Sequence, residues 1–245
     1  MTPKMIENII EDYYSQFCGI QLSKLEHGTY FICSAERDAK LKGFGCKYTI
    51  YMFVKDDLCV VSYSPKYKVF MEPLKKCSKN IVIAKIDQQF KLKKMKLMTF
   101  EKEIVTCYGN AKILKAADYP LYESFFRKTY PNTNPDEWLY EYFIEKTNKE
   151  YFTGYLSDNK LLSVCDAPDM PYMEDKIQHT GINTLKEERR KGYAKCTAAL
   201  AVHHLFEKNV CPQWECAAEN NASIELAKSI GYKEYGTAYI LKEWE

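Results

Sequence analysis

Several features that identify common protein classes are missing from this 245-residue sequence. No apolar run approaches the roughly 18–20 residues needed to cross a bilayer, and the N-terminus lacks the apolar core of a signal peptide. Glycine (10) and proline (9) are scarce, and no internal repeat is visible, which excludes collagen-like, low-complexity and solenoid chains. The net charge is only +2, so bulk charge indicates neither nucleic acid nor a membrane surface as a partner. We expect a globular cytoplasmic protein.

The ten cysteines also lack the spacing of a metal or redox site. They stand singly, with no C-x-x-C pair, and the four histidines fall in no ligand spacing beside them. Because no secretory signal precedes them, we interpret them as reduced, mostly buried thiols and expect no metal.

What is present divides unevenly along the chain. Residues 1–109 carry 18 basic and 12 acidic side chains (net +6), whereas residues 110–245 carry 17 and 21 (net −4). The lysine run at residues 91–96 is compatible with a phosphate-rich ligand, but a solvated edge or linker is the favoured interpretation. We predict two units, an N-terminal α+β domain of unknown role (1–109) and a C-terminal domain (110–245).

Periodicity predicts the elements of each half. In the first half we expect a helix at 5–17, strands at 28–33, 47–54 and 58–63, and a helical stretch after Ser64-Pro65, while 79–108 is ambiguous. In the second half we expect strands at 111–115, 151–157, 160–166, 176–185, 214–217 and 233–241, with helices at 118–130, 134–146, 191–208 and 220–230. The order βααβββαβαβ predicts an α+β fold: a mixed, mostly antiparallel sheet with helices on both faces.

The strongest chemical signal is the segment 181–195, where a strand, a charged turn and a long helix follow one another. The unpaired amides of a helix N-terminus and its dipole favour an anion there. Gly192 removes the Cβ that would block the approach, Ala194 keeps the first turn small, and Arg189, Arg190 and Lys191 add positive charge. These features predict a phosphate-binding turn.

This segment resembles motif A of the GCN5-related N-acetyltransferase (GNAT) superfamily, [QR]-x-x-G-x-[GA], here Arg189 to Ala194. The segment 214–232 resembles its motif B, with Asn220 eleven and Ser223 eight residues before Gly231. The predicted element order also matches that fold over residues 110–245, and residues 1–109 lie outside the resemblance. Within the superfamily, the chain looks closest to the zwittermicin-resistance-like acetyltransferase subgroup.

The resemblance implies acetyl-CoA as cosubstrate and no metal. It implies that backbone amides of Arg190 to Ala194, Tyr193 included, hold the pyrophosphate, and that the acetyl group lies between two strands that splay apart. It further implies that a set of polar and strand residues contacts the rest of the CoA arm. These are Asn183, Thr184 and Leu185, beside the pantetheine as one more strand would lie, together with Asn220 and Ser223.

Catalysis of acetyl transfer needs a base for the amine, a donor for the oxyanion and an acid for the thiolate. We expect a backbone amide near Leu185 to be the oxyanion donor. Glu215 is the first candidate for the base, with an exposed strand-end carboxylate as the alternative, and His179 is the second. The family's usual tyrosine acid is replaced by Ala227, which leaves Tyr193, Tyr232 or water for that role.

These residues predict an N-acetyltransferase that acetylates a primary amine of a small molecule by direct transfer in a ternary complex. The acidic and aromatic loop 166–175 would steer a cationic amine, and a solvated hairpin loop is the alternative interpretation. A CoA-binding sensor with little turnover is the alternative, and an RNA-associated enzyme is a weaker one. The sequence leaves the amine and the oligomeric state open, a homodimer included.

Overall fold

The computed structural model describes residues 1–166 and 169–244. The strands are β1 (Gly28–Cys33), β2 (Lys47–Lys55), β3 (Leu58–Tyr63), β4 (Lys93–Phe100), β5 (Ala111–Ile113), β6 (Thr153–Ser157), β7 (Lys160–Cys165), β8 (Ile177–His179), β9 (Ile182–Thr184), β10 (Cys211–Ala217) and β11 (Tyr232–Glu243). The α-helices are α1 (Pro3–Cys18), α2 (Lys68–Met71), α3 (Lys79–Phe90), α4 (Tyr119–Thr129), α5 (Leu139–Asn148), α6 (Tyr193–Glu207) and α7 (Asn221–Ser229). The predicted α+β class, with a mixed and mostly antiparallel sheet, is confirmed.

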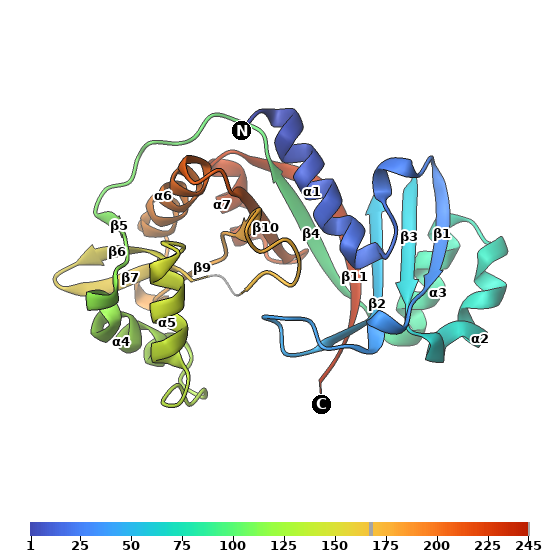
Figure 1. The fold of residues 1–245 in the computed structure, drawn as a ribbon, viewed down its shortest axis with the longest axis horizontal. Coiled ribbons are helices and arrows are strands. Elements are labelled where there is room, and N and C mark those ends of the chain that lie inside the picture. The colour runs from blue at the N-terminus through green and yellow to red at the C-terminus, as the bar shows by residue number, and fades with distance from the viewer. Residues whose placement is uncertain (167–168, 245) are drawn as a thin grey trace.

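The larger sheet has seven strands in the order β1-β3-β2-β11-β4-β10-β8 and draws them from both halves of the chain. Strand β11, from the C-terminus, pairs antiparallel with β2 on one side and with β4 on the other. Figure 1 shows this arrangement, with the green β4 and the red β11 side by side near the middle of the molecule. The two halves of the chain therefore share one sheet. The domain boundary predicted at residue 109 stays a prediction.

Strand β4 explains why residues 79–108 are ambiguous in the sequence. They form helix α3, then β4, then an irregular segment that leads to β5. Because β4 lies between β10 and β11, the lysine run at 91–96 is neither a sheet edge nor a linker, and that expectation was wrong. Lys96 pairs with Glu234, and Lys94 lies over the ring of Tyr239, so part of this charge is used within the sheet.

The smaller sheet has four strands in the order β5-β6-β7-β9, all antiparallel. The single strand predicted at 176–185 is instead two short ones, and this correction matters for the site. Strand β8 pairs parallel with β10 in the large sheet, whereas β9 pairs with β7 in the small sheet. The chain thus crosses between the sheets at Thr180 and Gly181, and α6 connects β8 and β9 to β10 as the predicted crossover.

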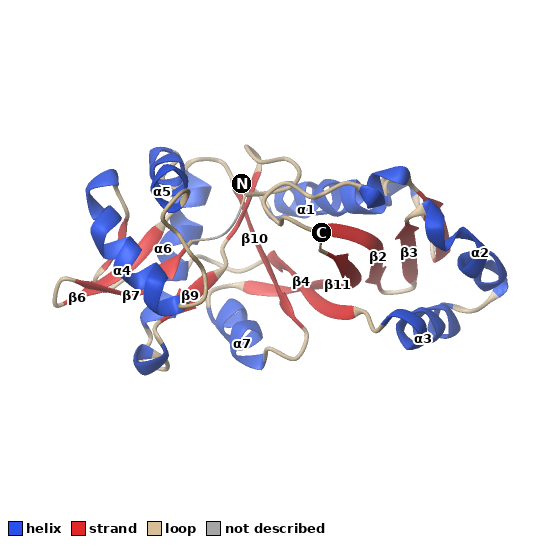
Figure 2. Cartoon of the chain, turned by 90° about the horizontal axis from the view of Figure 1, so that it is seen from below, coloured by secondary structure: helices blue, strands red, loops and turns tan. Residues whose placement is uncertain are grey.

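Helices cover both sheets, as Figures 1 and 2 show. Helix α1 begins at a Thr2 cap, ends at Gly19 in the left-handed conformation, and buries tyrosine and phenylalanine side chains against β2 and β4. Helix α6 packs on the small sheet, and α4 packs against β7. Within the described residues, no helix is long and apolar enough to cross a membrane.

Candidate functional site

The N-terminus of α6 has the geometry expected of an anion-binding turn. Gly192 is the residue before the helix and has φ +87°, and Arg190 before it also has a positive φ of 63°. No side chain caps the helix, so its first amides keep the free N–H groups that an anion needs. A Cβ built on Gly192 meets no atom within 4 Å, so the turn is open at this position.

Arg189 and Lys191 both bond within the protein. The Arg189 Nε donates to the Thr184 carbonyl oxygen over 3.2 Å, which ties the turn to the end of β9. Lys191 pairs with Glu188 at 2.8 Å, and the ring of Tyr193 stacks on Tyr155 with 4.4 Å between ring centroids. The cofactor roles of residues 189–194 remain predictions, and the open turn fits a pyrophosphate.

The register of β9 indicates which amide near Leu185 is free to act as the oxyanion donor. The Leu185 N–H donates to the Leu162 carbonyl over 3.0 Å, so this amide is already used within the small sheet. In an antiparallel pair successive residues direct their amides to opposite sides. The pairing of Ser163 with Thr184 therefore turns the Thr184 N–H away from β7, toward β10. Thr184, one residue before Leu185, is the better candidate for the donor.

His179 is the last residue of β8 that pairs with β10, and after it the chain leaves β10 and continues as β9. Its Nδ1 accepts the Gly181 N–H over 2.7 Å, and its Nε2 lies 3.2 Å from the Glu215 carbonyl oxygen. The backbone N of Glu215 lies 3.3 Å from the same Nε2. Because Nδ1 is an acceptor, the neutral ring carries its proton on Nε2, which then bonds the backbone carbonyl oxygen of Glu215. Burial lowers the pKa of His179 to about 4. Both nitrogens are therefore engaged, and this geometry favours a positioning role over the predicted base.

We expect His179→Ala to lower kcat/KM by roughly 10- to 100-fold, the usual cost of a small misplacement near the reacting groups. The midpoint of the pH–rate profile should stay where it is, since the ring is already neutral in the working range. His203→Ala, on the exposed side of α6, is the matched control. A shifted midpoint in His179→Ala would instead identify His179 as the titrating base.

Glu215 lies on β10, directly across the gap from β9, and is half-buried. Burial raises the pKa of its carboxyl to about 7, while Lys242 and Lys93 act to lower it. A carboxylate with a pKa near neutrality exists partly as base and partly as acid at physiological pH. The alternative expectation of a fully exposed strand-end carboxylate therefore does not describe Glu215.

The N-terminal half supplies the surroundings of Glu215. Its charge contributes to the raised pKa values of Tyr13 and Tyr14 on α1, and of Tyr48 and Tyr51 on β2. These four tyrosines were not predicted as part of the site, although the high tyrosine content of the chain, 20 residues, was a signal for them. Residues 1–109 thus contribute directly to the candidate site.

Motif B residues are also placed by the structure. Asn220 caps α7 by accepting the Ser223 N–H over 3.2 Å, and the Ser223 hydroxyl accepts from the Trp214 indole over 3.1 Å. Asn220 keeps its amide N–H groups as donors for a ligand. Ala227, which replaces the family's tyrosine, is fully buried. Its side chain is a methyl group and has no proton to donate.

The two proposed replacement acids are both held by contacts within the protein, Tyr232 through its hydroxyl and Tyr193 through its ring. The Tyr232 hydroxyl bonds Thr180 at 2.7 Å, and burial raises its pKa well above the usual value. Tyr193 lies stacked on Tyr155. We therefore assign the protonation of the thiolate to no side chain.

On the β7 side of the site, Asp166 forms a network that the sequence did not indicate. Its carboxylate accepts from the Asn183 side-chain amide over 3.1 Å and from the Tyr122 hydroxyl over 3.2 Å. The Asn183 amide also donates to Tyr130 over 2.8 Å. Burial raises the pKa of Asp166 to about 6. The Asn183 side chain is thus held beneath α4, and its backbone pairs with Val164 of β7 while its carbonyl oxygen accepts the Ser163 hydroxyl over 3.0 Å, so its contact with the CoA arm stays a prediction.

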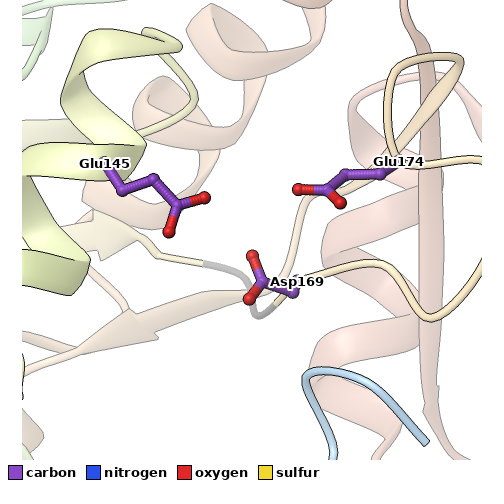
Figure 3. A group of neighbouring side chains, drawn as sticks. All are labelled: Glu145, Asp169 and Glu174. Atoms are coloured by element: carbon purple, nitrogen blue, oxygen red, sulfur yellow. The ribbon is translucent and has the colours of Figure 1, made fainter.

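The predicted acidic loop 166–175 is largely neutralised. Figure 3 shows Glu145, Asp169 and Glu174 pointing toward one another, with ligand atoms within 4.8 Å. Asp169 pairs with the buried Lys146, and Glu174 pairs with Lys42 and with Lys149, the latter at 2.7 Å. Glu145 also pairs with Lys149, at 3.2 Å. Ion pairing with lysines accounts for this cluster, and it weakens the expected steering of a cationic amine. Residues 167 and 168 of the loop lie outside the described residues.

Comparison with known proteins agrees with this geometry. Residues 28–241 match the GNAT acetyltransferase family. The chain belongs to that family, and the resemblance therefore extends well into the first half, beyond the predicted start at residue 110.

Individual relatives are more distant. An uncharacterised N-acetyltransferase of Bacillus subtilis (strain 168), YdfB, is 30% identical over 86 residues, which are 35% of this chain and 32% of that protein. The chain thus aligns with only about a third of this relative's length.

Among solved structures, a GNAT-family acetyltransferase from Colwellia psychrerythraea has a TM-score of 0.53 at 13% identity over 84% of this chain and 92% of that one. A GCN5-related N-acetyltransferase from Sphaerobacter thermophilus has a TM-score of 0.51 at 11% identity over 68% and 57%. At these identities the likeness shows the fold alone.

Proposed function

We propose that this chain transfers the acetyl group of acetyl-CoA to a primary amine of a small molecule, directly and within a ternary complex. One observation carries this proposal. The chain runs beside β10 as far as His179 and then continues as β9, which pairs with β7 instead. The open amide turn of α6 follows β9, and the half-buried Glu215 lies on β10. A bound thioester and an amine would meet in that gap. Membership of the GNAT acetyltransferase family supports acetyl-CoA as the donor.

The residues then divide the chemistry as follows. The amides at Gly192 and the first turn of α6 hold the pyrophosphate, and Asn220 and the β9 backbone orient the arm that ends in the thioester. Glu215 accepts a proton from the ammonium group, directly or through water, and the neutral amine attacks the acetyl carbonyl. The Thr184 N–H donates to the oxyanion of the tetrahedral intermediate. Collapse of the intermediate breaks the C–S bond, and the second proton that the nitrogen loses as the amide forms passes through water to the departing thiolate.

The same observations bear on the alternative, a CoA-binding sensor with little turnover. The buried Ala227 favours it, because no side chain there can protonate the departing thiolate. The zwittermicin-resistance-like subgroup likewise stays a prediction drawn from the motifs, and so does a cytoplasmic location.

We expect acetyl-CoA to raise the melting temperature by several degrees, in proportion to the logarithm of its concentration, while adenosine alone has little effect. The reason is that the amide turn of α6 grips the pyrophosphate, which adenosine lacks. Differential scanning fluorimetry measures the shift, and a thiol-release assay over a panel of amines measures turnover. No shift at millimolar acetyl-CoA would reject the proposal. A shift without thiol release from any amine would support the sensor.

A further inference from the structure

Two thiols are in contact at the start of helix α6. Cys196 lies in the first turn of the helix, where its N–H donates to the Gly192 carbonyl oxygen over 3.2 Å. Its side chain is in hydrogen-bond contact with the side chain of Cys107. Cys107 belongs to the irregular connector between β4 and β5, residues 101–110, which Figure 1 shows as a green trace that arches from one strand to the other. The pair therefore joins two segments that are far apart in the sequence.

Ring packing places this part of the connector on α6 independently of the thiols. Tyr108, the residue after Cys107, packs against His203 with 5.6 Å between ring centroids. Burial raises the pKa of Tyr108, and the charge of Glu207, one turn further along α6, adds to the effect. Because His203 is seven residues after Cys196, the two lie on the same face of the helix. The connector thus lies along the face of α6 that carries Cys196.

The next residue of the connector packs against the start of α6 through Tyr155. A Cβ built on Gly109 would lie 3.1 Å from the Tyr155 ring, and that ring stacks on Tyr193, the first residue of α6. The Ala111 N–H donates to the Tyr108 carbonyl oxygen over 2.9 Å, at the point where the connector enters β5. The backbones that carry the two thiols are therefore held beside each other by contacts that do not involve sulfur.

The two thiols differ in their access to solvent. Cys107 is exposed, whereas Cys196 is half-buried. Burial raises the pKa of Cys196, and its contact with Cys107 raises it further, so Cys196 stays a neutral thiol at physiological pH. Cys18 and Cys59, by contrast, are fully buried. A dissolved oxidant would therefore meet Cys107 first, with Cys196 next to it as the second thiol.

We propose that Cys107 and Cys196 form an oxidation site, at which a peroxide converts the two thiols into a disulfide that ties the connector to the first turn of α6. The thiolate of Cys107 attacks one oxygen of hydrogen peroxide, the O–O bond breaks, and a sulfenic acid and water form. The sulfur of Cys196 then attacks the sulfur of the sulfenic acid, and a second water leaves. The two thiols give up two protons and two electrons, which reduce one peroxide to two waters. A small dithiol reverses the reaction by exchange.

This disulfide would hold the turn that begins at Gly192. Because the two side chains are already in contact and their backbones are fixed, we expect the bond to keep the turn in the arrangement that the reduced protein has. Oxidation should therefore stabilise the fold and leave the amides of α6 accessible to a pyrophosphate. The inference goes beyond acetyl transfer and does not depend on it.

The test treats the whole chain with equimolar hydrogen peroxide and counts thiols after denaturation. The wild type should lose two of its ten thiols, and dithiothreitol should restore them. Cys107→Ser and Cys196→Ser should form no disulfide, whereas Cys33→Ser, which alters an exposed cysteine on β1, should behave like the wild type. These two serine variants separate the proposed pair from the other cysteines.

Mass spectrometry identifies the bond directly. Tryptic peptides prepared without reduction should show residues 103–112 linked to residues 196–208, and the oxidised protein should run as a single chain on a denaturing gel. A linkage between other cysteines, a linkage between two copies of the chain, or a sulfinic acid at Cys107 in place of the disulfide would overturn the proposal.

Melting curves measure what the bond does to the fold. Oxidised wild type should melt roughly 5–15 °C above the reduced protein, as expected of a cross-link that closes a long loop, and the serine variants should show no such rise. Acetyl-CoA should still raise the melting temperature of the oxidised protein. A disulfide that lowers the melting temperature, or that removes the acetyl-CoA shift seen in the reduced protein, would overturn the inference that it holds the turn in place. A reduced protein without any acetyl-CoA shift would reject only the proposed function.

Discussion

Glu215→Gln is expected to lower kcat/KM for acetyl transfer by roughly 10²-fold, within the usual range for loss of a general base. Glutamine keeps the shape of the side chain but cannot accept a proton from the ammonium group. Acetyl-CoA binding should hardly change, because Glu215 faces the tyrosines of α1 and β2 while the pyrophosphate turn lies at α6. Steady-state kinetics and a thermal-shift titration with acetyl-CoA measure the two effects separately.

The pH dependence gives the sharper test. Since the pKa of Glu215 is about 7, kcat/KM of the wild type should rise with pH and level off above that value. In Glu215→Gln the rate should follow the pKa of the amine itself, so the difference between the two proteins shrinks at high pH. Glu234→Gln, which alters an ion-paired glutamate on β11, should keep the wild-type profile. A wild-type profile in Glu215→Gln would remove Glu215 from the mechanism.

The same carboxyl also makes stability depend on pH. The folded-state pKa of about 7 lies above the usual value of 4.5, so the folded protein holds this proton more tightly than the unfolded chain. The resulting stabilisation is complete below pH 4.5 and is lost as pH rises through about 7. Glu215→Gln should therefore gain stability relative to the wild type over this interval, which melting curves at several pH values would detect.

Local patterns in the sequence were enough to predict the elements that depend on local interactions. The apolar spacing of 5–17 predicted α1, and the strands predicted at 151–157 and 160–166 are β6 and β7. They are joined at Asp158 and Asn159, residue types that tolerate the positive φ both have here. Motif A likewise predicted a helix N-terminus at Gly192, since a positive φ before a helix selects glycine there.

Features that depend on distant contacts were not predictable in this way. Strand β4 is placed between β10 and β11 by pairings with residues more than 100 positions away, which no local window contains. The break between β8 and β9 arises because the His179 ring takes the Gly181 N–H and replaces the strand pairing. The donor was predicted only as an amide near Leu185, because in a strand one residue reverses the direction of the amide and the register decides which amide is free.

The candidate site likewise has one half that local sequence patterns predict and one half that depends on distant contacts. Its cofactor half is a continuous motif, whereas its acceptor half combines Glu215 with tyrosines from α1 and β2, some 160 to 200 residues earlier in the chain.

Gly192→Val is expected to abolish stabilisation by acetyl-CoA. For the wild type, a ligand at about 100 times its Kd contributes about 2.7 kcal/mol, which corresponds to a rise of roughly 5–10 °C in melting temperature for a chain of this size. A Cβ at residue 192 would project into open space beside this turn, and we expect it to obstruct the approach of the pyrophosphate to the α6 amides. Scanning fluorimetry with and without acetyl-CoA measures the loss directly.

The variant will also be less stable on its own, because φ +87° at residue 192 strains any residue with a Cβ by about 1–2 kcal/mol. A control must therefore share that strain without touching the turn. Gly45→Val does so, since Gly45 has φ +63° and likewise has nothing within 4 Å of a built Cβ. Both variants should melt below the wild type, but only Gly45→Val should keep the full acetyl-CoA shift. If Gly192→Val kept it too, the pyrophosphate would bind elsewhere, and the function proposed from this turn would lose its support.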